Sequence, residues 1–141
     1  MNRILGIDFG DVRTGIAVSD TEQFLASGLI TLTAPSLGAL IEKIGSIAKE
    51  KNVEKIILGH PINMNGTLGE RSEKVKRFAA RLESELHLPV LLFDERCSTM
   101  AAHQFLNETD TRGKKRKEVV DALSAQIILQ NYLDSQKRPS L

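Results

Sequence analysis

The first apolar run of the chain ends in a charged residue. Residues 4–7 are apolar, Asp8 follows them, and a tight turn then leads into a second apolar run over residues 14–20. Burying a carboxylate costs on the order of several kcal/mol unless something compensates it, typically a cation. Glu95 and Asp121 stand in similarly apolar surroundings. These acids constrain both fold and chemistry, because a fold that buries their neighbours must also accommodate their charge.

Short apolar stretches alternate with amphipathic ones along the chain. The turn at residues 10–13 joins the first two runs as an antiparallel hairpin, and the apolar runs at 56–58 and 90–93 are typical of buried parallel strands. The spacings predict strands over residues 3–9, 14–20, 27–33, 56–58 and 90–93, and helices over residues 37–50, 69–87, 98–106 and 117–133. We therefore predict an α/β fold, a mixed five-stranded sheet that is antiparallel at one edge and parallel elsewhere, with helices on both faces.

Length and composition narrow the class of protein. The chain has 141 residues and no internal repeat or linker, so we expect a single domain over residues 1–141. Its one cysteine, Cys97, excludes an internal disulfide and fits a reducing compartment. With no apolar stretch long enough to span a bilayer, we expect a cytoplasmic protein without a membrane partner.

Cations are concentrated in two places, although the net charge is only +1. Five of the six residues from 112 to 117 are basic, and Lys74, Arg77 and Arg81 recur at helical spacing. Such patches in a neutral chain suit a surface that binds a polyanion; the alternative is a solvated loop and a solvated helix edge. We expect residues 107–117 to be a mobile loop that binds a phosphate backbone. The cations expected to make this contact are Lys114, Lys115, Arg116 and Lys117.

The three acids can converge. Asp121 shares a helical face with Ala125, Ile128 and Tyr132, so a helix packed by this face carries it inward. Asp8 ends the first strand and Glu95 follows the last, so they meet at one sheet edge if those strands are neighbours. Converging carboxylates repel one another unless a cation holds them, and oxygen-only ligands favour Mg²⁺ or Mn²⁺. A pair of such ions suits phosphodiester hydrolysis, which predicts a metal-dependent nuclease.

Each acid also has a purely structural alternative. The pairings left open are Glu95 with Arg96, Asp121 with Arg116 or Lys117, and Asp8 with the hairpin turn. Arg13 has two interpretations as well: its guanidinium fork suits a scissile phosphate near Asp8, or it braces the hairpin against Asp11 or Asp20. If the acids do crowd together, replacing Asp8 or Asp121 by Asn should slightly stabilise the metal-free protein by removing repulsion.

Four motifs in order resemble one family over nearly the whole chain. They are Asp8-x-Gly10-x-x-Arg13-x-Gly15-x-Ala17-x-Ser19-Asp20, Gly59-x-Pro61-x-x-Met64-x-Gly66, Asp94-Glu95-Arg96-x-Ser98-Thr99 and Asp121-Ala122-Leu123-x-Ala125. These motifs are similar to those of the YqgF/RuvX proteins, which are relatives of the RuvC Holliday junction resolvases. The resemblance implies an RNase H-like fold, with Asp8, Glu95 and Asp121 as metal-binding catalytic acids. It also implies a nuclease in 5′-end processing of precursor 16S rRNA, with a junction-cutting DNA endonuclease as the alternative.

The chain departs from the related RuvC-type sites at one position. Those sites use four carboxylates, two of them three residues apart on the last helix, whereas Ser124 stands three residues after Asp121 here. Glu118, three residues before Asp121, is the candidate fourth acid or else a surface ion-pair residue.

The expected partner is nucleic acid, either structured RNA, including precursor ribosomal particles, or branched DNA. The protein is expected to be a monomer or weak dimer. Two other classes remain open: a non-catalytic RNA-binding assembly factor, and half of an actin-like ATPase.

Overall fold

The computed structural model describes residues 2–61, 69–94 and 113–136, with side chains from residue 120 onward in the last range. In chain order the elements are β1 (Arg3–Phe9), β2 (Thr14–Ser19), β3 (Ala26–Leu32), α1 (Leu37–Glu50), β4 (Val53–His60), α2 (Glu70–Leu86), β5 (Val90–Asp94) and α4 (Gly113–Gln136). None of the helices in these ranges has the length and apolar character needed to cross a membrane.

The strands form one mixed sheet in the order β3-β2-β1-β4-β5. β2 is antiparallel to both β1 and β3, whereas β4 is parallel to both β1 and β5. The predicted hairpin and mixed sheet are therefore confirmed. The first and last strands are not neighbours, so the condition stated for the meeting of Asp8 and Glu95 is not met: β4 lies between β1 and β5. The carboxyl ends of these three parallel strands still share one edge of the sheet.

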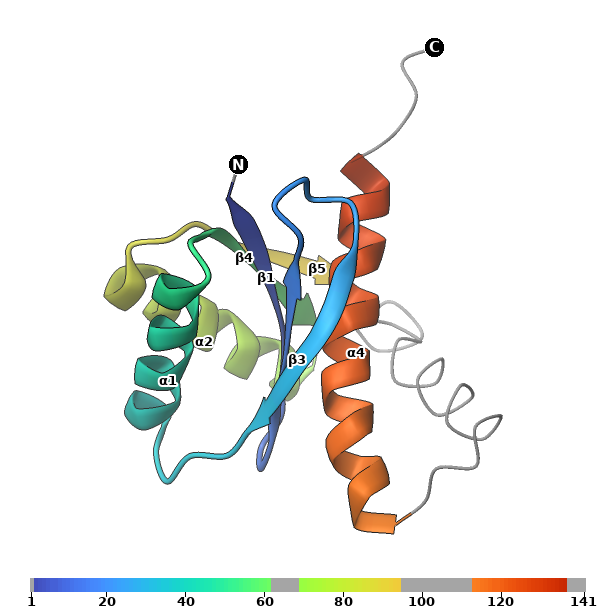
Figure 1. Ribbon diagram of the computed structural model, residues 1–141. Helices are drawn as coiled ribbons and strands as arrows, with labels where there is room; N and C mark the ends of the chain where they lie inside the picture. Colours follow the sequence, from blue (N-terminus) through green and yellow to red (C-terminus); the bar gives the residue numbers. More distant parts are fainter. Residues whose placement is uncertain (1, 62–68, 95–112, 137–141) are drawn as a thin grey trace.

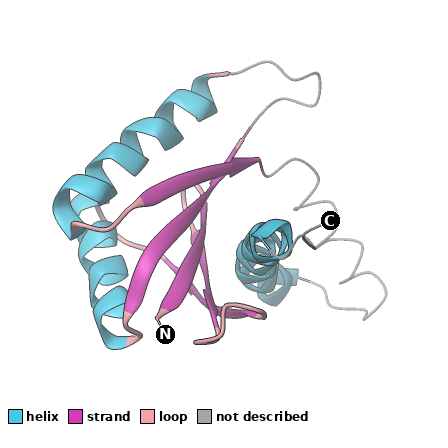
Figure 2. Cartoon of the chain, turned by 90° about the horizontal axis from the view of Figure 1, so that it is seen from above, coloured by secondary structure: helices cyan, strands magenta, loops and turns pink. Residues whose placement is uncertain are grey.

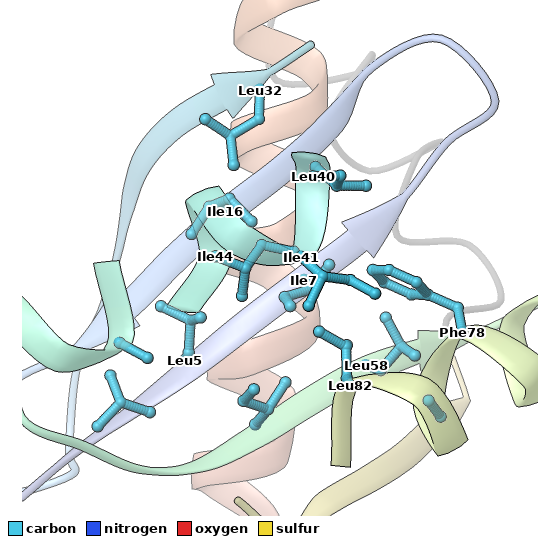
Figure 3. Packing of buried hydrophobic residues seen from close by; sticks show 14 of the residues in the cluster. Leu5, Ile7, Ile16, Leu32, Leu40, Ile41, Ile44, Leu58, Phe78 and Leu82 are labelled. Atoms are coloured by element: carbon cyan, nitrogen blue, oxygen red, sulfur yellow. The ribbon is translucent and has the colours of Figure 1, made fainter. Parts of the chain in front are cut away.

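Helices cover both faces of the sheet, as predicted (Figures 1 and 2). α1 and α2 lie on one face, where Leu5 and Ile7 of β1 join the larger core cluster (Figure 3). α4 lies on the other face, where Ile4 of β1 packs with Leu129 and Ile128. This division follows from strand geometry, because successive side chains of a strand point to opposite faces. Each fully buried aliphatic side chain contributes roughly 1.5–3 kcal/mol of transfer free energy.

The first two helices lie close to where the sequence predicts them. α1 begins after Ser36, whose Oγ accepts the Ala39 N–H at 3.2 Å and so caps the helix. The predicted helix over residues 69–87 is observed as α2, and its apolar face buries Val75, Phe78 and Leu82. These boundaries follow from a clear apolar period and a capping residue.

Two predictions about the second half of the chain are wrong. The last helix begins at Gly113, so residues 114–117 lie in its first turns and do not form a loop. Lysine and arginine are good helix formers, and no proline or glycine interrupts the run. The strand at 90–93 is not buried, because β5 is at the end of the sheet order and Leu91 is 45% exposed. The predicted helix at 98–106 lies outside the described residues.

The turn between β2 and β3 is organised by Asp20. The backbone N–H groups of Leu25 and Phe24 donate to Asp20 Oδ1 at 3.1 and 2.8 Å. These two donors hold the pKa of the Asp20 carboxyl below its ordinary value. Asp20 is therefore committed to its own turn.

Glycines let α4 approach the sheet closely. A Cβ built on Gly6 of β1 would lie 2.7 Å from the Leu129 Cβ, and one on Gly15 of β2 would overlap the Asp121 carbonyl oxygen. No larger residue fits at Gly15 unless the helix moves, because the neighbour there is backbone. Gly15 therefore sets the distance between the sheet and the part of α4 that carries Asp121.

We predict that Gly15→Ala destabilises the protein by about 1–3 kcal/mol or more, because the added methyl group must displace α4. Gly28→Ala is the matched control: it adds the same group under the same helix, but its nearest neighbour is the Ala122 carbonyl oxygen at 3.3 Å. The control should stay within about 1 kcal/mol of wild type. Urea unfolding measures both, and equal losses in the two variants would contradict the role given to Gly15.

Candidate active site

Asp8 and Asp121 are brought to the same place on the sheet. Asp8 is one residue from the end of β1, and strand alternation puts it on the face of Ile4 and Gly6, which α4 covers. Its partner across the β1–β2 ladder is Gly15, the residue on which the Asp121 backbone rests. Cα atoms of residues directly opposite each other in an antiparallel ladder are about 4.5–5.5 Å apart. Both acids therefore adjoin Gly15 at the carboxyl end of β1.

The face of α4 that carries Asp121 is the one predicted. Ala125, Ile128 and Tyr132 are all at least 96% buried against the sheet, and the Asp121 side chain is 19% exposed. The helix therefore carries this carboxylate inward, toward the end of β1.

An arginine compensates the charge of Asp121. Arg13 Nε donates to Asp121 Oδ2 at 2.6 Å, and the Arg13 side chain is 34% exposed. This charge-assisted hydrogen bond ties the hairpin turn to α4. Asp121 is not the partner expected from the sequence. The structural partners predicted there for Arg13 are Asp11 and Asp20. Asp20 binds its own turn, and Asp11 pairs with cations of α2.

A buried hydroxyl, that of Ser124, follows Asp121 by three residues on α4. Ser124 is fully buried, and within the described part of the chain its Oγ makes no hydrogen bond. This spacing puts it on the same side of α4 as Asp121. An unsatisfied buried polar group costs about 1–3 kcal/mol, so native proteins contain few of them. The carboxylates of Asp8 and Asp121 are oxygen donors, which fit Mg²⁺ or Mn²⁺ and not a soft metal.

The side chains of the other predicted site residues lie outside the part of the chain that the structure describes. Glu95 lies outside the described residues. Among the described side chains, those of residues 2–61, 69–94 and 120–136, no three His, Cys, Asp or Glu residues form a group that could hold a metal. Glu118 belongs to α4 by its backbone, as do the four predicted phosphate-binding residues Lys114, Lys115, Arg116 and Lys117.

Polar contacts of His60 and Arg71, on the α2 side of the sheet, are not predicted from the sequence. His60, at the end of β4, is hydrogen-bonded through Nε2 to the Oγ of Ser72, 2.6 Å away, and Ser72 is fully buried. The position of Ser72 three residues before Val75, on the apolar face of α2, is the signal that could have revealed it. Arg71 donates to the Phe9 carbonyl oxygen at 2.5 Å and pairs with Asp11 at 3.4 Å. These contacts hold the ends of β4 and β1 against α2.

The family model and the similar proteins indicate the same family. A family model described as "RuvX: Holliday junction resolvase" matches residues 2–135. A protein of Clostridium novyi named "Putative pre-16S rRNA nuclease" is 47% identical over 133 residues, which cover 94% of this chain and 98% of that protein. One of the same name from Caldanaerobacter subterraneus subsp. tengcongensis is 45% identical over 136 residues, covering 96% and 98%.

Solved structures resemble the fold at low sequence identity. Thermus thermophilus RuvC in complex with a Holliday junction substrate matches with a TM-score of 0.60 at 14% identity, covering 96% of each chain. The fowlpox virus resolvase in complex with Holliday junction DNA matches with a TM-score of 0.60 at 10% identity, covering 96% of this chain and 99% of that one. These matches confirm the predicted RNase H-like fold.

The ion pair changes one expectation about stability. Because Arg13 compensates Asp121, we predict that Asp121→Asn destabilises the metal-free protein instead of stabilising it. A double-mutant cycle of Arg13→Gln and Asp121→Asn should give a coupling of about 0.5–1 kcal/mol, kept small because solvent screens the exposed part of Arg13. Urea unfolding with excess chelator measures the coupling, which should fall in 1 M salt. A coupling of zero at low salt would contradict the compensating role.

Proposed function

Because the chain belongs to the RuvX family, we propose that it is a metal-dependent nuclease that hydrolyses phosphodiester bonds in the 5′ region of precursor 16S rRNA. The observation that carries the proposal is the meeting of Asp8 and Asp121 at Gly15, with Arg13 bound to one of them. The choice of RNA is supported by the names of relatives that are 45–47% identical to this chain.

The proposed catalytic acids are Asp8, Glu95 and Asp121, which would hold Mg²⁺ or Mn²⁺. Bound ions of this kind supply an activated water for attack and stabilise the charge on the leaving oxygen. Asp8 is fixed by its place in a central strand, and Asp121 by the packing of α4 on Gly15. Glu95 directly follows β5, which is parallel to β4 and ends at the same edge of the sheet as β1. Glu118 is the further candidate on α4.

Arg13 is proposed to act in two ways. Through Nε it holds the Asp121 carboxylate, so it positions one of the proposed acids. A guanidinium has five N–H donors in a planar fork, so the remaining donors of Arg13 can bind a phosphate oxygen at the same time. The side chain is 34% exposed, which leaves it accessible to a substrate strand. Arg13 would thus place a phosphate next to the acids.

The basic start of α4 is proposed as the contact for the nucleic-acid backbone. Lys114, Lys115, Arg116 and Lys117 precede Asp121 on the same helix, and Lys117 is about one turn away from it. The positive end of the helix dipole adds to their charge and favours phosphate. Because these residues belong to a helix, the spacing of their backbone positions is fixed before the nucleic acid binds. No loop has to fold on binding.

The wider setting follows from this assignment. We propose that the protein acts in the cytoplasm as a monomer or weak dimer, on precursor ribosomal particles. Branched DNA is the second candidate substrate, favoured by the description of the family model and by the likeness in fold to resolvases bound to Holliday junctions. An assembly factor that binds RNA without cutting it is the alternative of another class.

We predict that Asp8→Asn and Asp121→Asn each lower Mg²⁺-dependent cleavage of precursor 16S rRNA by more than about 100-fold. Arg13→Gln should lose about 10–100-fold, because it disturbs the position of an acid without removing one. Glu42→Gln, an exposed change on α1, is the matched control and should keep full activity.

The same assay separates the rival functions. A synthetic four-way DNA junction is tested beside the rRNA precursor, each with Mg²⁺, with Mn²⁺ and with excess chelator. Faster cutting of the junction would favour the DNA enzyme, and tight binding of RNA without cleavage by either ion would favour the assembly factor. Cleavage that persists in chelator would contradict the metal dependence.

We predict that changing Lys114, Lys115, Arg116 and Lys117 together to Gln weakens RNA binding about equally for unrelated sequences. Glutamine retains helix propensity, so α4 should persist. The slope of log K against log salt should fall by roughly 0.7–0.9 for each lost phosphate contact. Filter binding at several salt concentrations measures the slope, with Lys49→Gln on α1 as the control. An unchanged slope in a variant of unchanged stability would mean that these cations are only solvated.

A further inference from the structure

A pocket of about 500 Å³ lies on the face of the sheet opposite α4. Its walls are the β1–β2 turn, the segment that leads into α1, and one side of α2. Its volume is within the range of about 300–1,000 Å³ that small-molecule sites occupy. Neither Asp8 nor Asp121 lines it, so the proposed active site does not account for it.

The floor of the pocket is apolar and partly aromatic. Phe9 lines it and stacks on the buried Phe78, with ring centroids 4.1 Å apart and planes inclined by 13°. Leu32 and Leu40 complete the floor and belong to the core cluster beneath it (Figure 3). Phe9 is only partly buried, so its ring offers apolar surface to a ligand. A planar, weakly polar group fits such a floor.

One wall of the pocket is basic. Lys74, Arg77 and Arg81 follow one another at i, i+3 and i+7 along α2, and all three line the pocket. Lys74 lies 3.6 Å from Asp11, and Arg81 pairs with Glu85 on its own helix. Arg77 forms no ion pair within the described ranges. Asp11 is the one acid among the lining residues, so the wall carries an excess of positive charge.

The start of α1 adds to this charge. Ser36 and Leu37 line the pocket, and a helix N-terminus carries a partial positive charge. A Cβ built on Gly38 in the first turn of α1 would lie 3.5 Å from Arg81 Nη2, so the basic wall reaches across to this helix end. The pocket thus combines an apolar floor with a rim that is complementary to an anion.

We propose that this pocket binds a nucleotide, with its base on Phe9 and the apolar floor and its phosphate on Arg77, Lys74 and Arg81. A nucleotide combines a flat aromatic ring with a phosphate, the two features for which the pocket is built. The ligand is either a free mononucleotide or an unpaired nucleotide of a strand. The second source rests on the proposed function: the β1–β2 turn that borders the pocket also carries Arg13, so one strand could cross it to reach both sites.

The test is a titration followed by amide NMR in excess chelator, so that no metal is bound and nothing is cleaved. Adenosine, guanosine and uridine 5′-monophosphates are titrated separately, beside inorganic phosphate. We expect the nucleotides to shift the amide signals of Val12, Leu37 and Arg77, and to bind more tightly than phosphate. Arg77→Ala should weaken nucleotide binding by about tenfold, whereas Lys76→Gln should leave it unchanged. Lys76 lies on the same helix but does not line the pocket.

A second variant fills the pocket from the wall that leads into α1. Ala34→Phe places a ring inside the pocket and should abolish binding, with a melting temperature near that of wild type as the control for folding. A hexanucleotide of single-stranded RNA distinguishes the two sources: much tighter binding than the mononucleotide supports a strand, and equal binding supports a free ligand.

Other results overturn the proposal. They are binding of phosphate as tight as that of every nucleotide, no effect of Arg77→Ala, no binding of either nucleotide or hexanucleotide, or signal shifts confined to Asp8 and Asp121. A failure of the cleavage assay leaves these titrations unaffected, because they require no catalysis.

Discussion

The close contact between α4 and the sheet at Gly15 determines the rest of the candidate site. Residue 15 faces Asp8 across the β1–β2 ladder and supports the backbone of Asp121. A side chain at this position would push the helix outward and separate the two acids. The absence of a side chain therefore has a chemical consequence: it lets carboxylates from a strand and from a distant helix share one small region. The rigidity of both elements holds that geometry, and the Arg13 contact from the β1–β2 turn adds to it.

Charge balance explains why an arginine belongs in this region. Asp121 is 19% exposed, and its approach to Asp8 would be unfavourable without compensation. Arg13 supplies one positive charge through the contact at 2.6 Å. With Glu95 as the proposed third acid, three carboxylates and one guanidinium leave a net charge of −2, which one divalent cation neutralises. The ion pair is thus compatible with a metal site and does not replace it.

Local patterns in the sequence predict much of the fold and of the candidate site. They do not predict contacts between segments that are distant in the chain. The bounds of α1 and the inward face of α4 follow from apolar spacing, which acts over a few residues. The Arg13–Asp121 pair joins residues 108 positions apart, so no spacing indicates it. An apolar run likewise cannot tell an outer strand such as β5 from a central one, nor can it give the strand order. Sequence patterns do not locate the start of α4, because a run of cations is compatible with either a loop or a helix. Glu95 as the third acid stays a prediction.

Strand alternation relates the candidate active site to the pocket on the other face. Asp8 and Phe9 are consecutive residues of β1, so Asp8 lies on the face of α4 and Phe9 on the face of α1 and α2. A slip of one residue in the β1–β2 register would exchange them and would bury the carboxylate in the larger core. The turn that prevents such a slip is tight, because a Cβ on Gly10 would overlap the Arg13 carbonyl oxygen. Arg71 holds the same turn from α2 through Phe9 and Asp11. One short turn, fixed from α4 by Arg13 and from α2 by Arg71, thereby sets the position of both sites.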